Sequence, residues 1–258
     1  MDLILEQVTH RYGDLVALES IDLEIRTGEI VALIGPSGCG KSTLLGILGG
    51  LVQPSGGRVL QLGAAPSACL NALTSVFQDF ALLPWRDVAG NVALPLEHHG
   101  LSRGEIAQRV AAALAKIGLA EFATAFPKQL SGGMRQRVGI ARALVVEPAV
   151  LLMDEPLSAL DAQTRELLME DLLKLWSATH FTSVYVTHNL AEAVRLAHRV
   201  VVLSRRPGRV REIVDITTAH GDRDSVAGAG DLKRLQDRLW LSIKSEAQLA
   251  EREILAHA

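Results

Sequence analysis

The amino-acid sequence predicts an α/β fold, and three observations support this prediction. The segment EIVALI at 29–34 is a short, continuous apolar run, which is typical of a fully buried strand. A glycine-containing loop follows it, and the next residues, STLLGILGGL, have helical spacing. Two further apolar runs, at 149–153 and 182–186, are separated by a segment of helical periodicity at 162–178. Short buried strands that alternate with helices indicate an open α/β sheet.

The remaining strands are predicted mainly before and after this central part. Residues 2–9 and 19–26 alternate apolar and polar side chains, which indicates half-buried antiparallel strands. Residues 57–63 read as another strand, and 74–78 as a buried strand that ends at Gln78. Two strands near the end of the chain, RVVVLS and GRVREIV, are joined by a tight turn at Pro207-Gly208.

Several helices can be placed from their first and last residues. Ser102, with Glu105 three positions later, forms a capping box, and Gly118 ends the helix that follows. A shorter helical segment is expected near 121–126, where Pro127 stops it. Residues 217–231 are polar and contain glycine, which predicts a linker. The segment 231–254 returns to helical spacing, and its apolar face must pack against this chain or a partner; that face comprises Leu232, Leu235, Leu239 and Ile243.

Composition excludes several classes of protein. The chain has 258 residues and a formal net charge of −3, so it carries no basic footprint for nucleic acid. Its two cysteines do not suggest a disulfide scaffold, and a reducing compartment fits them. The first residues lack the pattern of a signal peptide, and no apolar run reaches membrane-spanning length, so we expect a soluble chain.

The most informative stretch is GPSGCGKST at 35–43. It fits the pattern G-x-x-x-x-G-K-[ST] at Gly35, Gly40, Lys41 and Ser42. Glycines let backbone amides approach phosphate oxygens, a lysine reaches the β- and γ-phosphates, and a serine hydroxyl ligates Mg²⁺. The alternative, a simple glycine-rich turn, is disfavoured because a strand precedes the loop and a helix follows it. The stretch therefore predicts binding of a nucleoside triphosphate.

A second anion-binding helix terminus is predicted at LSGGMRQR, residues 130–137. Ser131 is a good N-cap, and Gly132 and Gly133 expose their amides in the first turn. The alternative is an ordinary capped helix start. Two glycines are poor helix formers and bring no structural gain, which favours the functional interpretation.

Polar side chains follow two of the buried strands. Asp154 and Glu155 end one of them, where one carboxylate can hold Mg²⁺ and its neighbour can take a proton from water. The alternative is a solvated acidic strand end. Another strand ends at Thr187-His188; a lone histidine there is usually structural, but as a third polar group at the rim of the same sheet it favours a functional role.

Two residues are ambiguous by themselves. Tyr12, just before Gly13, could pack in the core or offer a stacking surface, and the core is favoured. Cys39 could be a redox switch, but a small residue that fills the loop is the better interpretation.

Together these motifs resemble the nucleotide-binding subunit of an ATP-binding cassette (ABC) transporter over almost the whole chain. The resemblance rests on six motifs in the family's order: GPSGCGKST as the Walker A loop, Gln78 as the Q-loop, LSGGMRQR as the signature, VLLMDEP as the Walker B strand, SALD at 158–161 as the D-loop, and His188 as the switch histidine. Met134 departs from the commonest signature, which has glutamine there, but the serine and both glycines are intact. The implied fold is a P-loop NTPase with a RecA-like core, an antiparallel β subdomain and an inserted helical subdomain at about 79–146. The cassette is expected at 1–216, with a linker and a C-terminal helix at 217–258.

The resemblance also implies roles for individual residues. Catalysis would involve Glu155, which polarises the attacking water, with His188 at the γ-phosphate and Gln78. Mg²⁺ would be held by Ser42, Gln78 and Asp154. ATP would be bound by Tyr12, stacked on adenine, and by the loop residues Gly35, Pro36, Ser37, Gly38, Cys39, Gly40, Lys41, Ser42 and Thr43. The ATP site of the other subunit in a head-to-tail homodimer would be completed by Ser131, Gly132 and Gly133.

A finer resemblance concerns the transported solute and the partners. FQDFALLPWRDVAGNVALPLE and VVLSRRPGRV are similar to the bacterial importer branch for nitrate, taurine and aliphatic sulfonates. This implies integral membrane permease subunits, a separate external solute-binding protein, no nucleic acid, and a peripheral position on the cytoplasmic face of the bacterial inner membrane. The segment at roughly 78–100 would pass motion to the permease.

Two other kinds of ABC protein stay open as alternatives. One is an ABC ATPase without a transport role, which typically carries a coiled-coil insertion or a second cassette. The other is an exporter ATPase, which is often fused to membrane helices. The sequence has none of these features.

Overall fold

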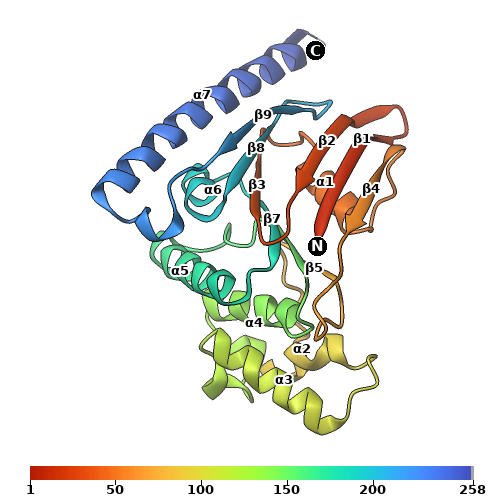
Figure 1. The fold of residues 1–258 in the computed structure, drawn as a ribbon, viewed down its shortest axis with the longest axis vertical. Helices are drawn as coiled ribbons and strands as arrows, with labels where there is room; N and C mark the ends of the chain where they lie inside the picture. Colours follow the sequence, from red (N-terminus) through yellow and green to blue (C-terminus); the bar gives the residue numbers. More distant parts are fainter. Residues whose placement is uncertain (257–258) are drawn as a thin grey trace. The chain divides into compact units, whose positions relative to one another are not determined.

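The computed structural model describes residues 1–256, and the side chains of residues 1–246 (Figure 1). The chain divides into two compact units, which are described separately. Unit 1 comprises Met1–Gly63 and Thr182–Ala258, and unit 2 comprises Ala64–Phe181. The division at residue 216 stays a prediction, and the last two residues of the expected segment 217–258 lie outside the described part.

One layer of unit 1 is a three-stranded antiparallel sheet in the order β2-β1-β4, formed by β1 (Asp2–Tyr12), β2 (Leu15–Ile25) and β4 (Gly56–Leu62). Leu3, Leu5 and Val8 of β1 are buried and alternate with more exposed residues. This is the pattern of a sheet with one face in the core. It confirms the antiparallel strands predicted at 2–9 and 19–26.

Unit 1 also contains a mostly parallel sheet in the order β7-β3-β8-β9. Its strands are β7 (Thr182–Val186), β3 (Ile30–Ile34), β8 (Arg199–Leu203) and β9 (Val210–Asp215). The strand β3 pairs in parallel with β7 and β8, whereas β9 pairs antiparallel with β8. Every residue of β3 and β7 is buried, which is typical of strands in a parallel sheet. The helices α1 (Lys41–Leu48) and α6 (Leu190–Leu196) pack against this sheet.

The long helix α7 (Val226–Ala256), dark blue in Figure 1, belongs to unit 1 and begins inside the predicted linker. The linker prediction is wrong from Val226 onward, since Ser225 starts the helix. Its hydroxyl accepts a 3.0 Å hydrogen bond from the amide of Gly228, and its carbonyl accepts one of 2.8 Å from Ala229. Leu232 and Leu239 are buried, and the helix packs on α6 and β8. The sequence left open whether this apolar face packs against the same chain or against a partner, and the described part of α7 packs against its own chain.

Unit 2 combines two parallel strands, β5 (Leu73–Val76) and β6 (Val150–Asp154), with helices. The helices are α2 (Val88–Ala93), α3 (Arg103–Lys116), α4 (Gly132–Leu144) and α5 (Ala162–Thr179), with short 3₁₀ turns η1 (Leu94–Leu96), η2 (Ala120–Phe122) and η3 (Pro127–Gln129). In β5 only Val76 is fully buried, so this strand is less buried than its apolar sequence predicts. Apolar residues of α2, α3 and α4 form one core, including Val92, Leu114 and Val138.

The helix boundaries of unit 2 follow the sequence with one exception. The capping box of Ser102 and Glu105 is present, and α3 ends just before Gly118 as predicted. The helix predicted near 121–126 is wrong, because only the 3₁₀ turn η2 forms there and a second turn, η3, begins at Pro127. A segment this short forms too few backbone hydrogen bonds to offset the entropy lost in helix nucleation. No helix within residues 1–256 has both the length and the apolar character needed to cross a membrane.

Candidate functional site

In unit 1, residues 35–40 connect β3 directly to α1, as the sequence predicts. Gly40 is the N-cap of α1 in the left-handed conformation (φ 102°), and no side chain caps this helix. The amides of its first turn therefore remain available to an anion, which the helix dipole also favours. Ser42 is exposed, and Thr43 is half-buried. The local geometry of this loop can bind a phosphate group.

Lys41 is held by the loop itself. Its Nζ donates hydrogen bonds of 2.8 Å to the carbonyl oxygen of Gly35 and 3.0 Å to that of Pro36. These bonds place a positive charge within the loop, from which a flexible lysine can turn to a bound phosphate.

Cys39 is 1% exposed, and burial raises the pKa of its thiol. A buried thiol that stays protonated is a poor nucleophile. This supports the interpretation of Cys39 as a small residue that fills the loop.

Tyr12 lies at the surface near the start of α1, so its assignment to the core is wrong. The side chain is 53% exposed, and its hydroxyl lies 3.4 Å from Oγ1 of Thr43. Its ring contacts that of His10 edge to face, with the centroids 4.5 Å apart. Burial of an aromatic depends on contacts that a local pattern does not contain. The exposed ring beside the phosphate loop suits stacking on a base.

The exposed His188 lies in unit 1 between β7 and α6, next to a buried polar network. Glu192 is only 3% exposed, and Oε2 of its carboxylate accepts hydrogen bonds from the hydroxyls of Thr187 (2.7 Å) and Tyr185 (2.9 Å). The amide of Asn189 donates to the Thr187 hydroxyl at 3.0 Å. The segment that carries His188 is therefore fixed on both sides. Glu192 could not be recognised from the sequence, because an acidic residue in the first turn of a helix usually faces solvent.

In unit 2, Gln78, Glu155 and Ser158 lie close together. Nε2 of Gln78 is 3.5 Å from the hydroxyl of Ser158, which donates a 2.9 Å hydrogen bond to the carbonyl of Glu155. Glu155 has a φ of 46°, a left-handed conformation that is uncommon for a residue with a side chain. Such strain is frequent at functional sites. Asp154 precedes it at the end of β6, and both side chains are partly exposed.

The signature segment also forms as predicted. The hydroxyl of Ser131 accepts a 3.2 Å hydrogen bond from the amide of Met134 and so caps α4. Only the backbone of Met134 takes part, so the usual glutamine is not needed for this cap. Gly132 is exposed, and a Cβ there would meet nothing within 4 Å. At Gly133 a Cβ would lie 2.7 Å from Cγ2 of Thr164, so this glycine does have a structural purpose, contrary to prediction.

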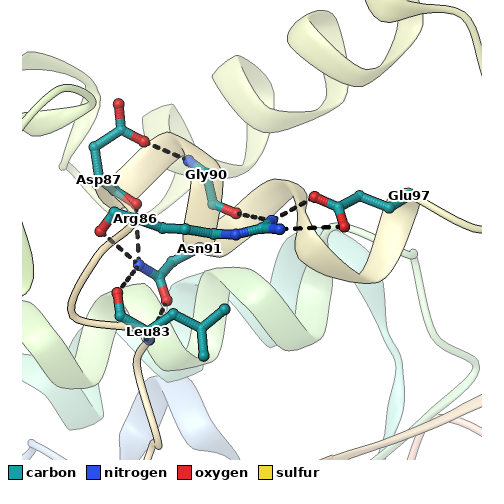
Figure 2. Close-up of polar contacts among 6 residues, drawn as sticks. All are labelled: Leu83, Arg86, Asp87, Gly90, Asn91 and Glu97. Atoms are coloured by element: carbon teal, nitrogen blue, oxygen red, sulfur yellow. Dashed lines mark hydrogen bonds and ion pairs between the residues drawn. The ribbon is translucent and has the colours of Figure 1, made fainter.

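The segment after Gln78 is organised by Asn91, which is 0% exposed (Figure 2). Its Oδ1 accepts a 2.8 Å hydrogen bond from the amide of Leu83. Its Nδ2 lies 3.0–3.1 Å from the carbonyl oxygens of Leu83, Arg86 and Asp87. The guanidinium of Arg86 forms an ion pair with Glu97 across α2. One buried amide thus ties an irregular segment to the helix that follows it.

The oxygen donors predicted for a metal suit Mg²⁺. Ser42, Gln78 and Asp154 offer a hydroxyl, an amide and a carboxylate oxygen, which are ligands of the hard type that Mg²⁺ prefers. Mg²⁺ at nucleotide sites is held by one or two protein groups together with phosphates and water. Among the described residues, no three His, Cys, Asp or Glu side chains gather as a protein-only metal site.

The predicted residues fall into two sets. Tyr12, the phosphate loop and His188 belong to unit 1, whereas Gln78, Ser131–Gly133, Asp154 and Glu155 belong to unit 2. Within each unit the structure brings Tyr12 to Thr43, and Gln78 to the turn after Glu155. The role of each residue toward ATP stays a prediction.

Comparisons with known proteins identify the family of this chain. The family model described as ABC transporter matches residues 18–158. An aliphatic sulfonates import ATP-binding protein of Mesorhizobium japonicum is 45% identical over 238 residues, which cover 90% of this chain and 86% of that protein. A putative ATP-binding protein of Brucella abortus is 42% identical over 237 residues, with 92% of this chain and 91% of that protein covered.

Solved structures show the same fold. The dimeric structure of a bacterial ABC transporter cassette matches with a TM-score of 0.71 and 35% identity, over 84% of this chain and all of the other. A dimeric post-hydrolysis state of that cassette, bound to ADP and inorganic phosphate, matches with the same TM-score and 34% identity, again over 84% of this chain and all of the other. The chain is a member of the ABC transporter family and has the fold of its ATP-binding cassettes.

Proposed function

We propose that this chain is the ATP-hydrolysing subunit of a bacterial ABC importer for a small anionic or zwitterionic solute, such as nitrate, taurine or an aliphatic sulfonate. Two copies would act with a membrane permease and an external solute-binding protein at the cytoplasmic face of the inner membrane. The observation that carries this proposal is the likeness to an aliphatic sulfonates import ATP-binding protein over most of both chains.

The phosphate loop and Tyr12 would hold the nucleotide. The uncapped first turn of α1 supplies backbone amides for the phosphates, and Lys41 would exchange its two carbonyl partners for phosphate oxygens. The exposed ring of Tyr12 would stack on adenine beside Thr43.

Hydrolysis would depend on groups that lie near the ends of several strands. Glu155 would accept the proton of the attacking water, and His188 would contact the γ-phosphate. Ser42, Gln78 and Asp154 would hold Mg²⁺, which when bound neutralises phosphate charge. The left-handed backbone at Glu155 supports its role, since strain of this kind is retained where the side chain must be aimed.

The N-terminus of α4 would act on a second copy of the chain. Ser131, Gly132 and Gly133 would contact the ATP bound by that copy, in a dimer with a two-fold axis. The open space around Gly132 supports this role, because an anion can approach its amide without meeting a side chain. ATP would then add contacts between the copies that hydrolysis removes.

ATP binding can be tested with Lys41→Ala. We expect saturating ATP and Mg²⁺ to raise the unfolding free energy of the wild type by about 3 kcal/mol at a hundredfold excess over Kd. Lys41→Ala should lose this stabilisation. Lys233→Ala, which removes an exposed lysine of α7, should retain it. Equal stabilisation of all three proteins would count against the phosphate-loop assignment.

The transport role needs a separate experiment. The chain would be affinity-purified from its native membranes in mild detergent, and co-purifying proteins identified by mass spectrometry. A multi-span membrane protein in stoichiometric amount is expected, and its solute-binding protein can then be screened with taurine, sulfonates and nitrate. Recovery from the soluble fraction alone, without such a protein, would contradict the importer while leaving the ATPase intact.

A further inference from the structure

The turn between β8 and β9, residues 204–209, lies directly against the phosphate loop; we call it the backing turn. Nε and Nη2 of Arg206 donate hydrogen bonds of 3.2 and 3.1 Å to the carbonyl oxygen of Gly38. Two residues further on, a Cβ added to Gly208 would lie only 2.1 Å from the carbonyl oxygen of Cys39. Only glycine fits at this distance, so the two backbones are in close contact.

The contact from Arg206 fixes a peptide group of the phosphate loop. The carbonyl of Gly38 and the amide of Cys39 belong to the same planar peptide and point in opposite directions. With the carbonyl held by Arg206, the amide of Cys39 is directed back into the loop, where it donates to the carbonyl of Pro36 at 3.3 Å. The backing turn therefore sets the orientation of a group in the loop that binds phosphate.

The backing turn is held firmly on its other sides. The hydroxyl of Ser204 accepts a 3.0 Å hydrogen bond from the amide of Arg209, and the amide of Ser204 donates to the carbonyl of Arg209 at 2.9 Å. Gly208 is bonded to β2 through its amide, 2.9 Å from the carbonyl of Ala17, and through its carbonyl, 3.0 Å from the amide of Glu19. Because these bonds make the turn rigid, a displacement of the turn would move the phosphate loop that it contacts.

A carboxylate of the C-terminal helix reaches this turn. Glu246 of α7 is 8% exposed, and its Oε2 accepts a 2.8 Å hydrogen bond from the amide of Arg205. Its other oxygen, Oε1, forms an ion pair with Arg211 of β9. One side chain therefore binds the residue before Arg206 and the strand after the turn. A buried carboxylate without these partners would be costly, so the contacts tie α7 to the turn.

We infer that Glu246 is a positioning residue for nucleotide binding: it links the C-terminal helix to the backing turn, and through Arg206 to the phosphate loop. The inference rests on the proposed binding of ATP at residues 35–43. It gives the C-terminal helix a role in the ATP site that acts through the backing turn.

The test measures the Kd for ATP with Mg²⁺ by calorimetry, together with kcat and KM, on the full chain. Glu246→Ala and Arg206→Ala should each raise Kd and KM about three- to tenfold, as expected for loss of one charge-assisted contact that orients the loop. The value of kcat at saturating ATP should stay within about twofold, because neither residue is proposed to touch the reacting groups. The Kd of the double variant should be no higher than the higher of the two Kd values of the single variants, since both residues act through one linkage.

Two matched controls separate this role from general stability. Asp237→Ala removes an exposed acid of the same helix, paired with Lys233, and Arg209→Ala removes an arginine of the same turn that pairs with exposed Glu19. Both should bind ATP as the wild type does. If Glu246→Ala does not fold, Glu246→Gln is measured instead; it keeps the size of the side chain but removes the charge that binds Arg211 and the amide of Arg205, and it should raise Kd in the same direction.

Each outcome has a distinct meaning. A Kd for Glu246→Ala equal to that of Asp237→Ala, or effects of Glu246→Ala and Arg206→Ala that simply add, would overturn the inference. A wild-type chain that binds no ATP would overturn the proposed function itself.

Discussion

The hydroxyl of Thr187 donates a 2.7 Å hydrogen bond to the buried carboxylate of Glu192. These two residues lie on either side of the exposed His188 in the sequence. The same carboxylate oxygen accepts a hydrogen bond from Tyr185, so these two donors come from the end of β7 and the residue just before His188. A carboxylate is buried at this point because hydroxyl donors satisfy it. The arrangement fixes the backbone on both sides of His188.

Removing this anchor should affect turnover more than binding. Thr187→Val keeps the shape of the side chain but loses the hydroxyl, and we expect kcat to fall about tenfold, equivalent to roughly 1.4 kcal/mol. The Kd for ATP should change little, because the phosphate loop is untouched. Thr187→Ser, which restores the hydroxyl, should recover most of the activity. Wild-type kcat in Thr187→Val would show that the network does not position His188.

The role of Glu155 can be separated from that of an ordinary acidic residue. Glu155→Gln should still bind ATP, but turnover should fall by about 10²-fold or more, as expected for loss of a general base. Glu147→Gln is a matched control, because Glu147 also lies in unit 2 with a positive φ, of 51°, and pairs with Arg109 away from the strand end. Steady-state ATPase assays and ATP-dependent dimerisation would be measured for both. Near-normal turnover in Glu155→Gln would remove Glu155 from the proposed role.

Asn91 should be important for the stability of unit 2. Asn91→Leu keeps a side chain that branches at the same atom but leaves the amide of Leu83 and several carbonyls without their partner, which should cost about 2–3 kcal/mol. Urea unfolding monitored by circular dichroism measures this loss. Asn71→Leu, at an exposed position of the same unit, should change stability by less than about 0.5 kcal/mol. Comparable stability of the two variants would argue that other contacts hold the segment after Gln78.

Two histidines predict a dependence of stability on pH. Burial lowers the pKa of His198, and it lowers that of His220 to about 4, with Arg223 adding repulsion in both cases. The centroids of the two rings lie 4.7 Å apart, and Nε2 of His220 lies 2.8 Å from the carbonyl oxygen of Leu196. Glu29 opposes the shift at His198 only.

The folded state therefore favours neutral rings, whereas the unfolded chain takes up protons near pH 6.5. The stabilisation is complete above about pH 6.5 and is lost as the pH falls toward 4. Urea unfolding of the wild type at pH 7.5 and 5.0 should show this loss, and His220→Asn should reduce it. An equal loss in the variant would assign the effect to other groups.

The sequence predicts those parts of the site that consist of short local patterns. The phosphate loop, the cap at Ser131 and the capping box at Ser102 each depend on residues within a few positions, so their chemistry can be recognised without a fold. The helix start at Ser225 was missed because the glycines around it favoured a linker. The exposure of Tyr12 could not be predicted, since a local pattern does not reveal what covers a side chain.

Contacts over long distances in sequence explain the other omissions. Arg206 meets Gly38 across a separation of 168 residues, and Glu246 meets Arg205 across 41. Arg206 lies in the stretch VVLSRRPGRV, but nothing in its local pattern indicates a contact with the phosphate loop, and Glu246 looks like an ordinary surface charge in the sequence. The backing turn and its link to α7 become visible only once the strands are placed.

The division of the chain has a consequence for its synthesis on the ribosome. Strand β3 has Ile30 opposite Ser183 of β7 and Val31 opposite Arg199 of β8, so its partners emerge only after the whole of unit 2 has been translated. Unit 2 is continuous in sequence and can fold first, and until β7 and β8 have been translated both edges of β3 lack their hydrogen-bonding partners. Such an apolar strand is prone to aggregate during that interval. Slow translation or a scarcity of chaperones should therefore lower the yield of folded protein, while the molecules that do fold keep their ATP chemistry.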